Sequence, residues 1–403
     1  MLVKPALQLS SLLVLALASA ASALVRAPTS PQTEHALSVS LSGPEYVRKI
    51  QDLKVVATIT NTGSETLRIL QDPNTILSDA PTEKFSVVNK RGEGEGLTFI
   101  GMRVLYSPKV AAQQHEYMTL GPGLSLQIEH DLSRIYDFSS SSGRVNGGSG
   151  TYTIHPNKIF HIVDPTERKN VLQLHADAGD PHVMQITDMG MRDIQAQTPF
   201  NTTLTELPGA DSESYIDDDD TEFDTEIDTS TESFRPNFRN CPWSNQQALT
   251  QAAQVAQTNI NGAGWWLRTR PHSNPRYTTW FGWFDRRRYN TVYNGFRKMM
   301  RNPATRYTYD CRCTLGPSTY AYVYPNVGKS LFSDPVILAC ASLRRLGHSR
   351  NGIIIHEASH FYVNAGTRDI IYGVQPAKNL AARNPWSAIN NAANFAYFGE
   401  NRG

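Results

Sequence analysis

The chain has 403 residues, 40% of them hydrophobic, and a formal net charge of +1. That length suggests two domains, and that composition excludes a chain that is disordered throughout, because enough apolar residues are present for a core. Residues 235–403 carry 21 Lys and Arg against 6 Asp and Glu, whereas residues 1–234 carry 17 against 31. The near-neutral total therefore conceals an acidic N-terminal part and a basic C-terminal part.

Residues 1–23 are predicted to be a secretory signal peptide. Lys4 supplies the positive charge, Leu12 to Ala18 form the apolar stretch, and small residues ending at Ala20 or Ala23 offer a cleavage site. The alternative is an N-terminal membrane anchor, but the apolar run is too short to span a bilayer. Since no other stretch is long enough either, we expect a soluble protein that is secreted and has no membrane partner.

Residues 24–210 are predicted to form an antiparallel, Ig-like β-sandwich. Short segments with alternating apolar residues are separated by turn signals, which is typical of such folds. These segments include Leu53–Thr60, Leu67–Leu70, Phe85–Val88, Leu124–Ile128 and Thr151–Ile154. No catalytic arrangement is evident here, and the histidines lack ligand spacing. Asn201-Thr202-Thr203 is a sequon, which predicts a glycan on Asn201 in a surface segment.

Residues 211–236 differ in kind from the segments on either side. They include the run Asp217–Asp220, and no Lys or Arg occurs between Arg192 and Arg235. Such a run repels itself, so we predict a disordered acidic linker that is accessible to proteases and carries an activation cleavage. The alternative is a solvated spacer that is never cut.

Residues 237–403 are predicted to form an α+β domain that is mainly helical. Ser244 is a candidate N-cap for a helix through Gln246 to Ile260, and the apolar stripe from Tyr289 to Met300 has helical spacing. Two further helices are expected over Pro376–Arg383 and Trp386–Phe398. Thr319–Tyr324 alternates as a strand and is a candidate edge strand for pairing with an extended peptide.

The basic charge of this domain favours acidic substrates or anionic surfaces. No nucleic-acid motif is present, and we interpret Arg286-Arg287-Arg288 as the solvated face of a helix. We therefore expect no nucleic-acid partner.

All four cysteines lie in the C-terminal part, at positions 241, 311, 313 and 340. In a secreted protein this number predicts two disulfides. Cys311 and Cys313 are too close in sequence to pair easily, which leaves two connectivities open. A zinc site made of cysteines is not expected, because the spacing is not that of repeated C-x₂-C pairs.

His356, Glu357 and His360 stand in the H-E-x-x-H spacing, which places both imidazoles on one side of a helix. Ile353 to Ile355 are apolar enough to bury one face of that helix, and Asn364 and Gly366 are plausible stop residues. The alternative is a buried helix with two core histidines. A catalytic zinc usually takes a third protein ligand, and Asp369 is the nearest oxygen ligand downstream.

The segment Gly366–Gly373 resembles the G-T-x-D-x-x-Y-G signature of the aspzincin metallopeptidases, the group of deuterolysin and the fungal peptidyl-Lys metalloendopeptidases. The resemblance extends from about Cys241 to the C-terminus. It implies a zincin-like domain with one zinc ion per chain, bound by His356, His360 and Asp369. Glu357 would then activate the water, and Tyr372 would stabilise the oxyanion. The family pattern also implies the disulfides Cys241–Cys311 and Cys313–Cys340.

The resemblance further implies that the mature enzyme starts a few residues before Cys241, so that the sandwich is a pro-region. We expect a secreted, monomeric zinc endopeptidase that cleaves proteins and peptides and is made as a latent precursor with its own pro-region as intramolecular inhibitor. This pro-region has no cysteine to offer the metal. Steric cover steered by charge is therefore the favoured means of inhibition, and a permanent accessory domain is the alternative.

Two other functions remain open at this stage. One is a peptidyl-Lys-specific endopeptidase. That branch places two carboxylates at the positions of Ala393 and Ala396, which carry no charge here, so we expect a broader, deuterolysin-like specificity. The other is an inactive secreted zinc-binding or adhesion protein. The retention of Glu357, which is not a ligand, speaks against it.

Overall fold

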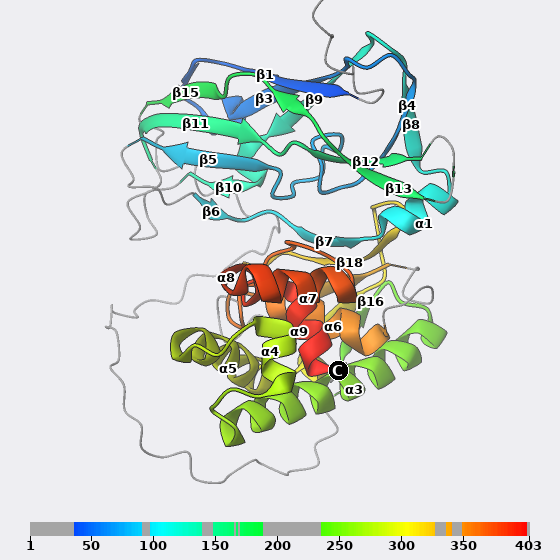
Figure 1. The fold of residues 1–403 in the computed structure, drawn as a ribbon, viewed down its shortest axis with the longest axis vertical. Coiled ribbons are helices and arrows are strands. Elements are labelled where there is room, and N and C mark those ends of the chain that lie inside the picture. The colour runs from blue at the N-terminus through cyan, green and yellow to red at the C-terminus, as the bar shows by residue number, and fades with distance from the viewer. Residues whose placement is uncertain are drawn as a thin grey trace, which may run out of the picture.

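The computed structural model describes residues 36–90, 97–138, 148–164, 167, 170–187, 235–326, 336–340 and 349–400. The predicted signal peptide, the sequon at Asn201 and the acidic segment from 211 to 234 lie outside these ranges. A strand-rich region, which stands at the top of Figure 1, precedes a region that is mostly helical. This division matches the expected order of a β region followed by an α+β region.

The strand-rich region begins at β1 and ends at β15. Its strands are β1 (Leu37–Ser42), β2 (Tyr46–Val47), β3 (Lys54–Asn61), β4 (Leu67–Leu70), β5 (Phe85–Asn89), β6 (Thr98–Phe99), β7 (Arg103–Tyr106), β8 (Tyr117–Leu120), β9 (Ser125–Asp131), β10 (Tyr136–Asp137), β11 (Gly150–Pro156), β12 (Ile159–Val163), β13 (Val171–His175), β14 (Asp177–Ala178) and β15 (His182–Ile186). Short helices are η1 (Ile50–Asp52), α1 (Pro108–Gln113) and η2 (Leu132–Arg134). The five predicted strands are present, each within a few residues of its expected limits.

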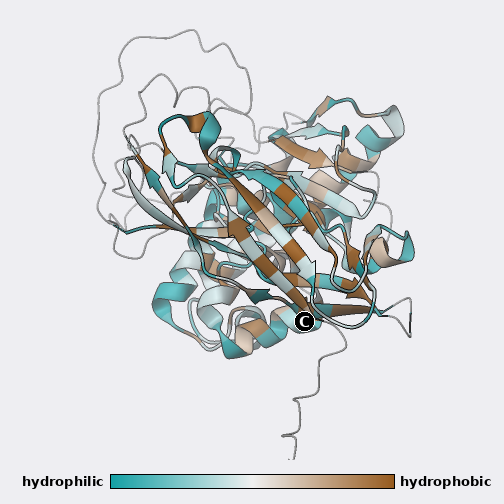
Figure 2. Cartoon of the chain, turned by 90° about the horizontal axis from the view of Figure 1, so that it is seen from above, coloured by the Kyte–Doolittle hydropathy of each residue, from teal (hydrophilic) through white to brown (hydrophobic). Residues whose placement is uncertain are grey.

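Alternation along the strands places every second side chain in the core. In β3 each odd-numbered residue from Val55 to Asn61 is buried and each even-numbered residue is partly exposed. Figure 2 shows the corresponding change between apolar and polar residues along the strands. The resulting core contains Leu53, Ile59, Tyr152 and Phe160, all buried.

Most neighbouring strands are antiparallel, in sheets ordered β14-β1-β3-β9, β2-β15-β11-β5 and β13-β12-β4-β8. The expectation of an entirely antiparallel region is wrong at two places, because β1 pairs with β14, and β2 with β15, in parallel. Each of these two partners is a strand of only two residues at the edge of its sheet. Patterns of alternating residues do not distinguish the direction of such short edge partners.

The C-terminal region consists of helices around a small sheet. Its elements are β16 (Asn237–Arg239), α3 (Trp243–Thr269), α4 (Pro275–Phe281), α5 (Arg286–Arg301), η4 (Ala304–Arg306), β17 (Thr308–Asp310), β18 (Thr319–Val323), β19 (Val336–Ala339), α6 (Arg350–His360), α7 (Val374–Arg383), α8 (Pro385–Ala388) and α9 (Ala392–Gly399). Helix α3 starts before Ser244 with Pro242 at the N-cap position, so the prediction that Ser244 caps it is wrong. No helix among the described residues combines the length and the apolar character needed to cross a membrane.

Helix α5 has the apolar stripe expected from the sequence, with Tyr289, Val292 and Phe296 buried. The interpretation of its three arginines as a solvated face fails for Arg288, which is 3% exposed. Its guanidinium carbon lies 4.8 Å from the ring centre of Trp283 and 5.3 Å from that of Trp386. The tryptophans on both sides therefore bury an arginine that helical periodicity alone places near solvent.

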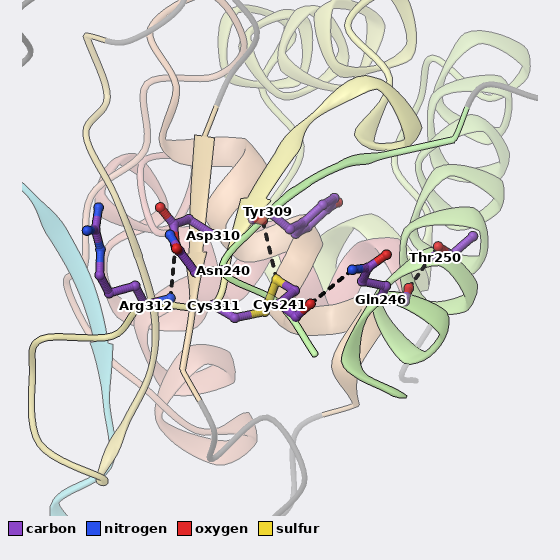
Figure 3. The surroundings of a disulfide bond; sticks show 8 residues. All are labelled: Asn240, Cys241, Gln246, Thr250, Tyr309, Asp310, Cys311 and Arg312. Atoms are coloured by element: carbon purple, nitrogen blue, oxygen red, sulfur yellow. Dashed lines mark hydrogen bonds between the residues drawn. A yellow bond between two sulfur atoms is a disulfide. The ribbon is translucent and has the colours of Figure 1, made fainter. Parts of the chain in front are cut away.

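Two disulfides close the C-terminal region, Cys241–Cys311 and Cys313–Cys340. Figure 3 shows the first of them joining the chain before α3 to the end of β17. Beside it, Gln246 donates a hydrogen bond to the carbonyl of Cys241, and Asn240 donates one to Asp310. These contacts attach the beginning of the C-terminal region to its sheet.

The sheet of the C-terminal region has the order β16-β17-β19-β18-β7, so its last strand comes from the strand-rich region. Strand β7 runs antiparallel to β18, with Leu105 opposite Ala321 and Val104 opposite Tyr322. Thr319–Tyr324 was predicted to be an edge strand that pairs with an extended peptide, and β18 is indeed the last strand that the C-terminal region contributes, with the extended strand β7 paired to it. Its hydrogen-bonding edge is the place where the two regions meet, as Figure 1 shows between β7 and β18.

Candidate metal and catalytic site

Helix α6 carries the H-E-x-x-H residues. Ser349 caps its first turn by accepting a hydrogen bond from the amide of Gly352, and Ile353 to Ile355 are buried in the core. His356, Glu357 and His360 are buried as well, at 3%, 0% and 0% exposure. The centres of the two imidazole rings lie 4.8 Å apart, as their spacing of four residues predicts.

The helix ends at His360, earlier than the predicted stop residues. Asn364 and Gly366 lie beyond it, where the side chain of Asn364 donates a hydrogen bond to the carbonyl of Ala358. Gly366 has a φ of 62°, a left-handed conformation that costs glycine little, and it turns the chain back toward the helix. The turn brings Thr367 against the last residues of α6.

Thr367 orients His360. The Nδ1 atom of His360 lies 2.9 Å from the carbonyl oxygen of Thr367, which favours the tautomer that donates from Nδ1. The Nε2 atom is then left with a lone pair for a metal ion. Ser359 supports the arrangement through a 2.6 Å hydrogen bond between its hydroxyl and that of Thr367.

Asp369 completes a cluster with the two histidines. Its Oδ1 lies 2.9 Å from Nε2 of His356, and its Oδ2 lies 3.4 Å from Nε2 of His360. The donor atoms of the three residues all lie within 4.8 Å of one another. Two nitrogens and a carboxylate at such distances suit a tetrahedral zinc ion with one position left for water.

The electrostatics of the cluster fit a metal site. Burial lowers the pKa of His356, and although burial disfavours the charged carboxylate, the two histidines hold the pKa of Asp369 well below its usual range. A neutral imidazole and an ionised carboxylate are the protonation states that bind metal. Within the described residues, Nε2 of His360 and Oδ2 of Asp369 are buried and make no hydrogen bond to the protein.

Both carboxylate oxygens of Glu357, the residue after His356, are buried, and neither accepts a hydrogen bond from the described residues. Burial raises the pKa of Glu357 well above its usual value, and the nearby Asp369 adds to this effect. A carboxylate held in this way is suited to take up a proton. The residue is therefore placed beside the ligands without being one of them.

Tyr372 flanks the site on the side of the strand-rich region. Its ring stacks on that of His356 with 6.2 Å between the centres, and its hydroxyl donates a 3.0 Å hydrogen bond to the carbonyl of Val104. A tyrosine hydroxyl aimed at a peptide carbonyl next to a metal site is the arrangement needed to stabilise an oxyanion.

Sequence reasoning missed the residue that holds the Asp369 segment. The predicted helix over Trp386–Phe398 is in fact two helices, α8 and α9, separated at Asn391. The side-chain oxygen of Asn391 accepts hydrogen bonds from the amides of Ile370 and Ile371, and its nitrogen donates to the carbonyl of Ile371. The helix breaks there because Asn391 also forms a bridge with Arg368.

Contacts from the strand-rich region around the site could not be found from the sequence either. Glu83 accepts hydrogen bonds from Arg368, the residue before Asp369, at 2.6 and 3.1 Å, and it also pairs with Arg103. Tyr362 donates to the carbonyl of Phe99. A cavity of about 610 Å³ lies between the two regions and is lined on one side by residues 368–372. No local signal predicts pairs separated by more than 260 residues.

Comparisons with known proteins agree with this geometry. The sequence profile of the family described as "Lysine-specific metallo-endopeptidase", the M35 aspzincins, matches residues 267–400. A "Peptidyl-Lys metalloendopeptidase" of Grifola frondosa is 35% identical over 383 residues, which is 94% of this chain and 97% of that protein. An "Extracellular protease" of Aeromonas hydrophila is 28% identical over 357 residues, which is 87% of this chain and 88% of that protein.

A solved structure, a zinc peptidase from Grifola frondosa, is 38% identical and covers 40% of this chain and 97% of its own, with a TM-score of 0.37.

Proposed function

Because this chain belongs to the aspzincin family of zinc metalloendopeptidases, we propose that it is a secreted enzyme that hydrolyses peptide bonds of extracellular proteins. In this proposal, His356, His360 and Asp369 hold one zinc ion. The main support is the cluster of these three buried residues, with their donor atoms within 4.8 Å of one another. Secretion is supported by the predicted signal peptide and by the extracellular relative from Aeromonas hydrophila.

Each residue of the site has its own role in the proposed reaction. Zinc, when bound, lowers the pKa of a water molecule toward neutrality and polarises the carbonyl of the substrate. Glu357 takes a proton from the attacking water and later delivers it to the leaving amine. Tyr372 donates a hydrogen bond to the carbonyl oxygen as negative charge develops on it.

Chelation tests the metal dependence directly. We expect the enzyme released from the full-length chain to digest casein, to lose this activity in excess chelator and to regain it when zinc is added back. The reason is that the three proposed ligands bind a single zinc ion, so a chelator that removes this ion removes the activity with it. Casein digestion at an unchanged rate in the presence of chelator, with zinc shown to be absent, would exclude a metalloenzyme.

We further propose that the chain is a latent precursor. In this proposal residues 1–23 are a signal peptide, 24–210 an Ig-like pro-region, 211–236 a linker that is cut on activation, and 237–403 a zincin-like catalytic domain. Three contacts support it. Strand β7 covers the open edge of β18, Val104 accepts the hydrogen bond of Tyr372, and Glu83 pairs with Arg368 beside Asp369. In this proposal these contacts keep a protein substrate away from the site until the linker is cut.

Latency predicts that the uncut chain is far less active than the same chain cut between 211 and 234. The separated pro-region, added back, should inhibit the released enzyme, and moderate salt should weaken this inhibition because exposed charges are screened over about 8–10 Å. Casein digestion and inhibition can be measured at low and moderate salt. Equal activity of the uncut and cut chains on casein would contradict latency and leave the sandwich as an accessory domain.

The variant Glu83→Gln tests how much charge contributes to the inhibition by the pro-region, because it removes the carboxylate that pairs with Arg368. It should weaken inhibition in trans a few-fold. Glu129→Gln is the control, since Glu129 is exposed and pairs with Lys54 instead.

We also propose a broad, deuterolysin-like specificity instead of a strict requirement for lysine. The support is the absence of charge at Ala393 and Ala396, both of which are buried. A lysine ammonium buried without a partner costs several kcal/mol. Peptide profiling that finds nearly all cleavages before lysine would overturn this proposal. A monomeric state, a glycan on Asn201 and the lack of nucleic-acid and membrane partners remain predictions.

A further inference from the structure

The hydrogen bond to Tyr372 identifies one peptide bond of the strand-rich region. The hydroxyl of Tyr372 lies 3.0 Å from the carbonyl oxygen of Val104. In the proposed reaction this hydroxyl faces the carbonyl of the bond that is cut. The Val104–Leu105 bond therefore occupies the position of a scissile bond, with Val104 on its amino side and Leu105 on its carboxyl side.

The pairing of β7 with β18 agrees with the placement of the Val104–Leu105 bond at the position of a scissile bond. Strand β7 is extended, runs antiparallel to β18 and places Val104 opposite Tyr322 and Leu105 opposite Ala321. Pairing of an extended segment with a sheet edge is a common way to hold a peptide, with side-chain pockets reading alternate residues. Strand β7 also contacts helix α6, which carries Glu357 and the two histidines.

The side chains of β7 alternate between two environments. Val104 and Tyr106 belong to the apolar cluster between the two regions, together with Met102 and Tyr322. Leu105 belongs instead to the core cluster of the C-terminal region and is 2% exposed. A leucine of the strand-rich region is thus buried among the apolar side chains of the catalytic region.

The cluster that receives Leu105 is apolar. Its members include Ala358 of α6, Ala321 and Val323 of β18, and Ala393 and Ala396 of α9. Once the strand-rich region leaves, apolar residues of this cluster would face the substrate side chain that replaces Leu105, beginning with Ala321, which pairs with Leu105 in the sheet. A surface of this kind favours an aliphatic side chain over a charged one.

The acids that the structure describes in residues 235–400 are engaged elsewhere. Asp285 caps α5, Asp310 accepts hydrogen bonds from Asn240 and Arg312, and Glu400 contacts Asn351 at the start of α6. Glu357 and Asp369 belong to the metal site. None of the described carboxylates of this region is therefore available to pair with a lysine ammonium beside Leu105.

We propose that the pocket for the residue after the scissile bond accepts an aliphatic side chain of the leucine class, and that the Val104–Leu105 segment shows how such a substrate lies. This proposal rests on the proposed function, since it takes Tyr372 as the residue that faces the scissile carbonyl. It goes beyond a broad specificity because it names the preferred class of side chain.

The test uses the enzyme released from the full-length chain by cutting between 211 and 234, loaded with zinc. A peptide with the sequence of residues 99–110 contains Leu105 and, four residues later, Lys109. We expect mass spectrometry to find cleavage between Val104 and Leu105. Cleavage only before Lys109 would overturn the proposal, because it would mean that the enzyme selects lysine even when leucine is offered.

The same peptide with Leu105→Lys is the matched comparison, and one with Leu105→Met is the conservative control. We expect kcat/KM at this bond to fall by about tenfold or more for lysine, because an ammonium buried without a partner is strongly disfavoured. It should fall by little for methionine, which has nearly the same volume as leucine. An equal or higher kcat/KM for lysine would also overturn the proposal. If none of these peptides nor casein is cut, the proposed function itself has failed, and the two failures are thus distinguishable.

Discussion

The Glu357→Gln enzyme is expected to keep its zinc and to lose peptidase activity by about 10²–10⁴-fold. The two side chains are nearly equal in size, and Glu357 is not among the three residues whose donor atoms form the metal cluster. The amide cannot take a proton from the attacking water, so the general-base contribution is removed while the site keeps its shape. The measurements are zinc content by elemental analysis and the rate of casein digestion.

Two further variants make this result specific. His360→Ala should lose both zinc and activity, because it removes a ligand that Thr367 holds in place. Glu129→Gln, at an exposed position of β9, should change neither. Casein digestion by Glu357→Gln at the wild-type rate would show that the catalytic assignment is wrong.

The Lys84→Met variant is expected to stabilise the strand-rich region at pH 7 and to destabilise it slightly above pH 10. Lys84 is fully buried just before β5, and burial lowers the pKa of its ammonium from 10.5 to about 7, although Asp79 and Asp72 oppose this. His130 is a further titratable group near Lys84, and burial together with Lys84 lowers its pKa to about 4. The ammonium is thus held where charge is disfavoured.

The direction of the pH effect follows from the depressed pKa of Lys84. Between pH 7 and 10.5 the unfolded chain binds a proton at Lys84 that the folded chain does not, so the free energy of unfolding rises with pH across that window. Below about pH 7 both states are protonated, and the cost stays constant at roughly 5 kcal/mol. Methionine removes this cost. However, the carbonyl of Ser78 accepts a hydrogen bond from Lys84, and losing this bond lowers the free energy of unfolding by about 1–3 kcal/mol.

Urea unfolding of the full-length chain, followed by hydrogen exchange in peptides from β3 and β11, measures the change at pH 7 and at pH 10.5. The control is Lys54→Met, because Lys54 is exposed and its ion pair with Glu129 contributes little. A Lys84→Met protein that is less stable than the wild type at pH 7 would contradict a buried, depressed lysine.

The elements of the metal site differ in how far local sequence could predict them. The positions of His356 and His360 on one helix follow from the four-residue spacing, which holds wherever a helix forms. The short loop to Asp369 was also readable, because Gly366 permits the left-handed turn that brings this residue back. The break at Asn391 was not, because α9 is mostly apolar along its length and the bridge that Asn391 forms with Arg368 joins residues from separate segments of the chain.

The burial of side chains was likewise predictable from local sequence at some positions and not at others. Ile353 to Ile355 were expected in the core and are buried there, since a run of branched apolar residues has no favourable exposed state. Arg288 was expected at the solvated face of its helix, and no sequence pattern predicted the burial of Lys84. Their burial depends on tryptophan rings and on a backbone carbonyl supplied by other parts of the chain, and no periodic pattern encodes such partners.

The sequence by itself determined the family, the helix with the metal-binding spacing, the residues that could act there and the change from a strand-rich to a helical region. All of these depend on residues close together in the chain or on a repeated period. Only the tertiary structure decided that β7 pairs with β18, that Val104 faces Tyr372 and that Leu105 lies in the core of the C-terminal region. Such contacts join residues more than 200 positions apart, and their partners are chosen by the packing of the two regions, which local propensity and spacing do not specify.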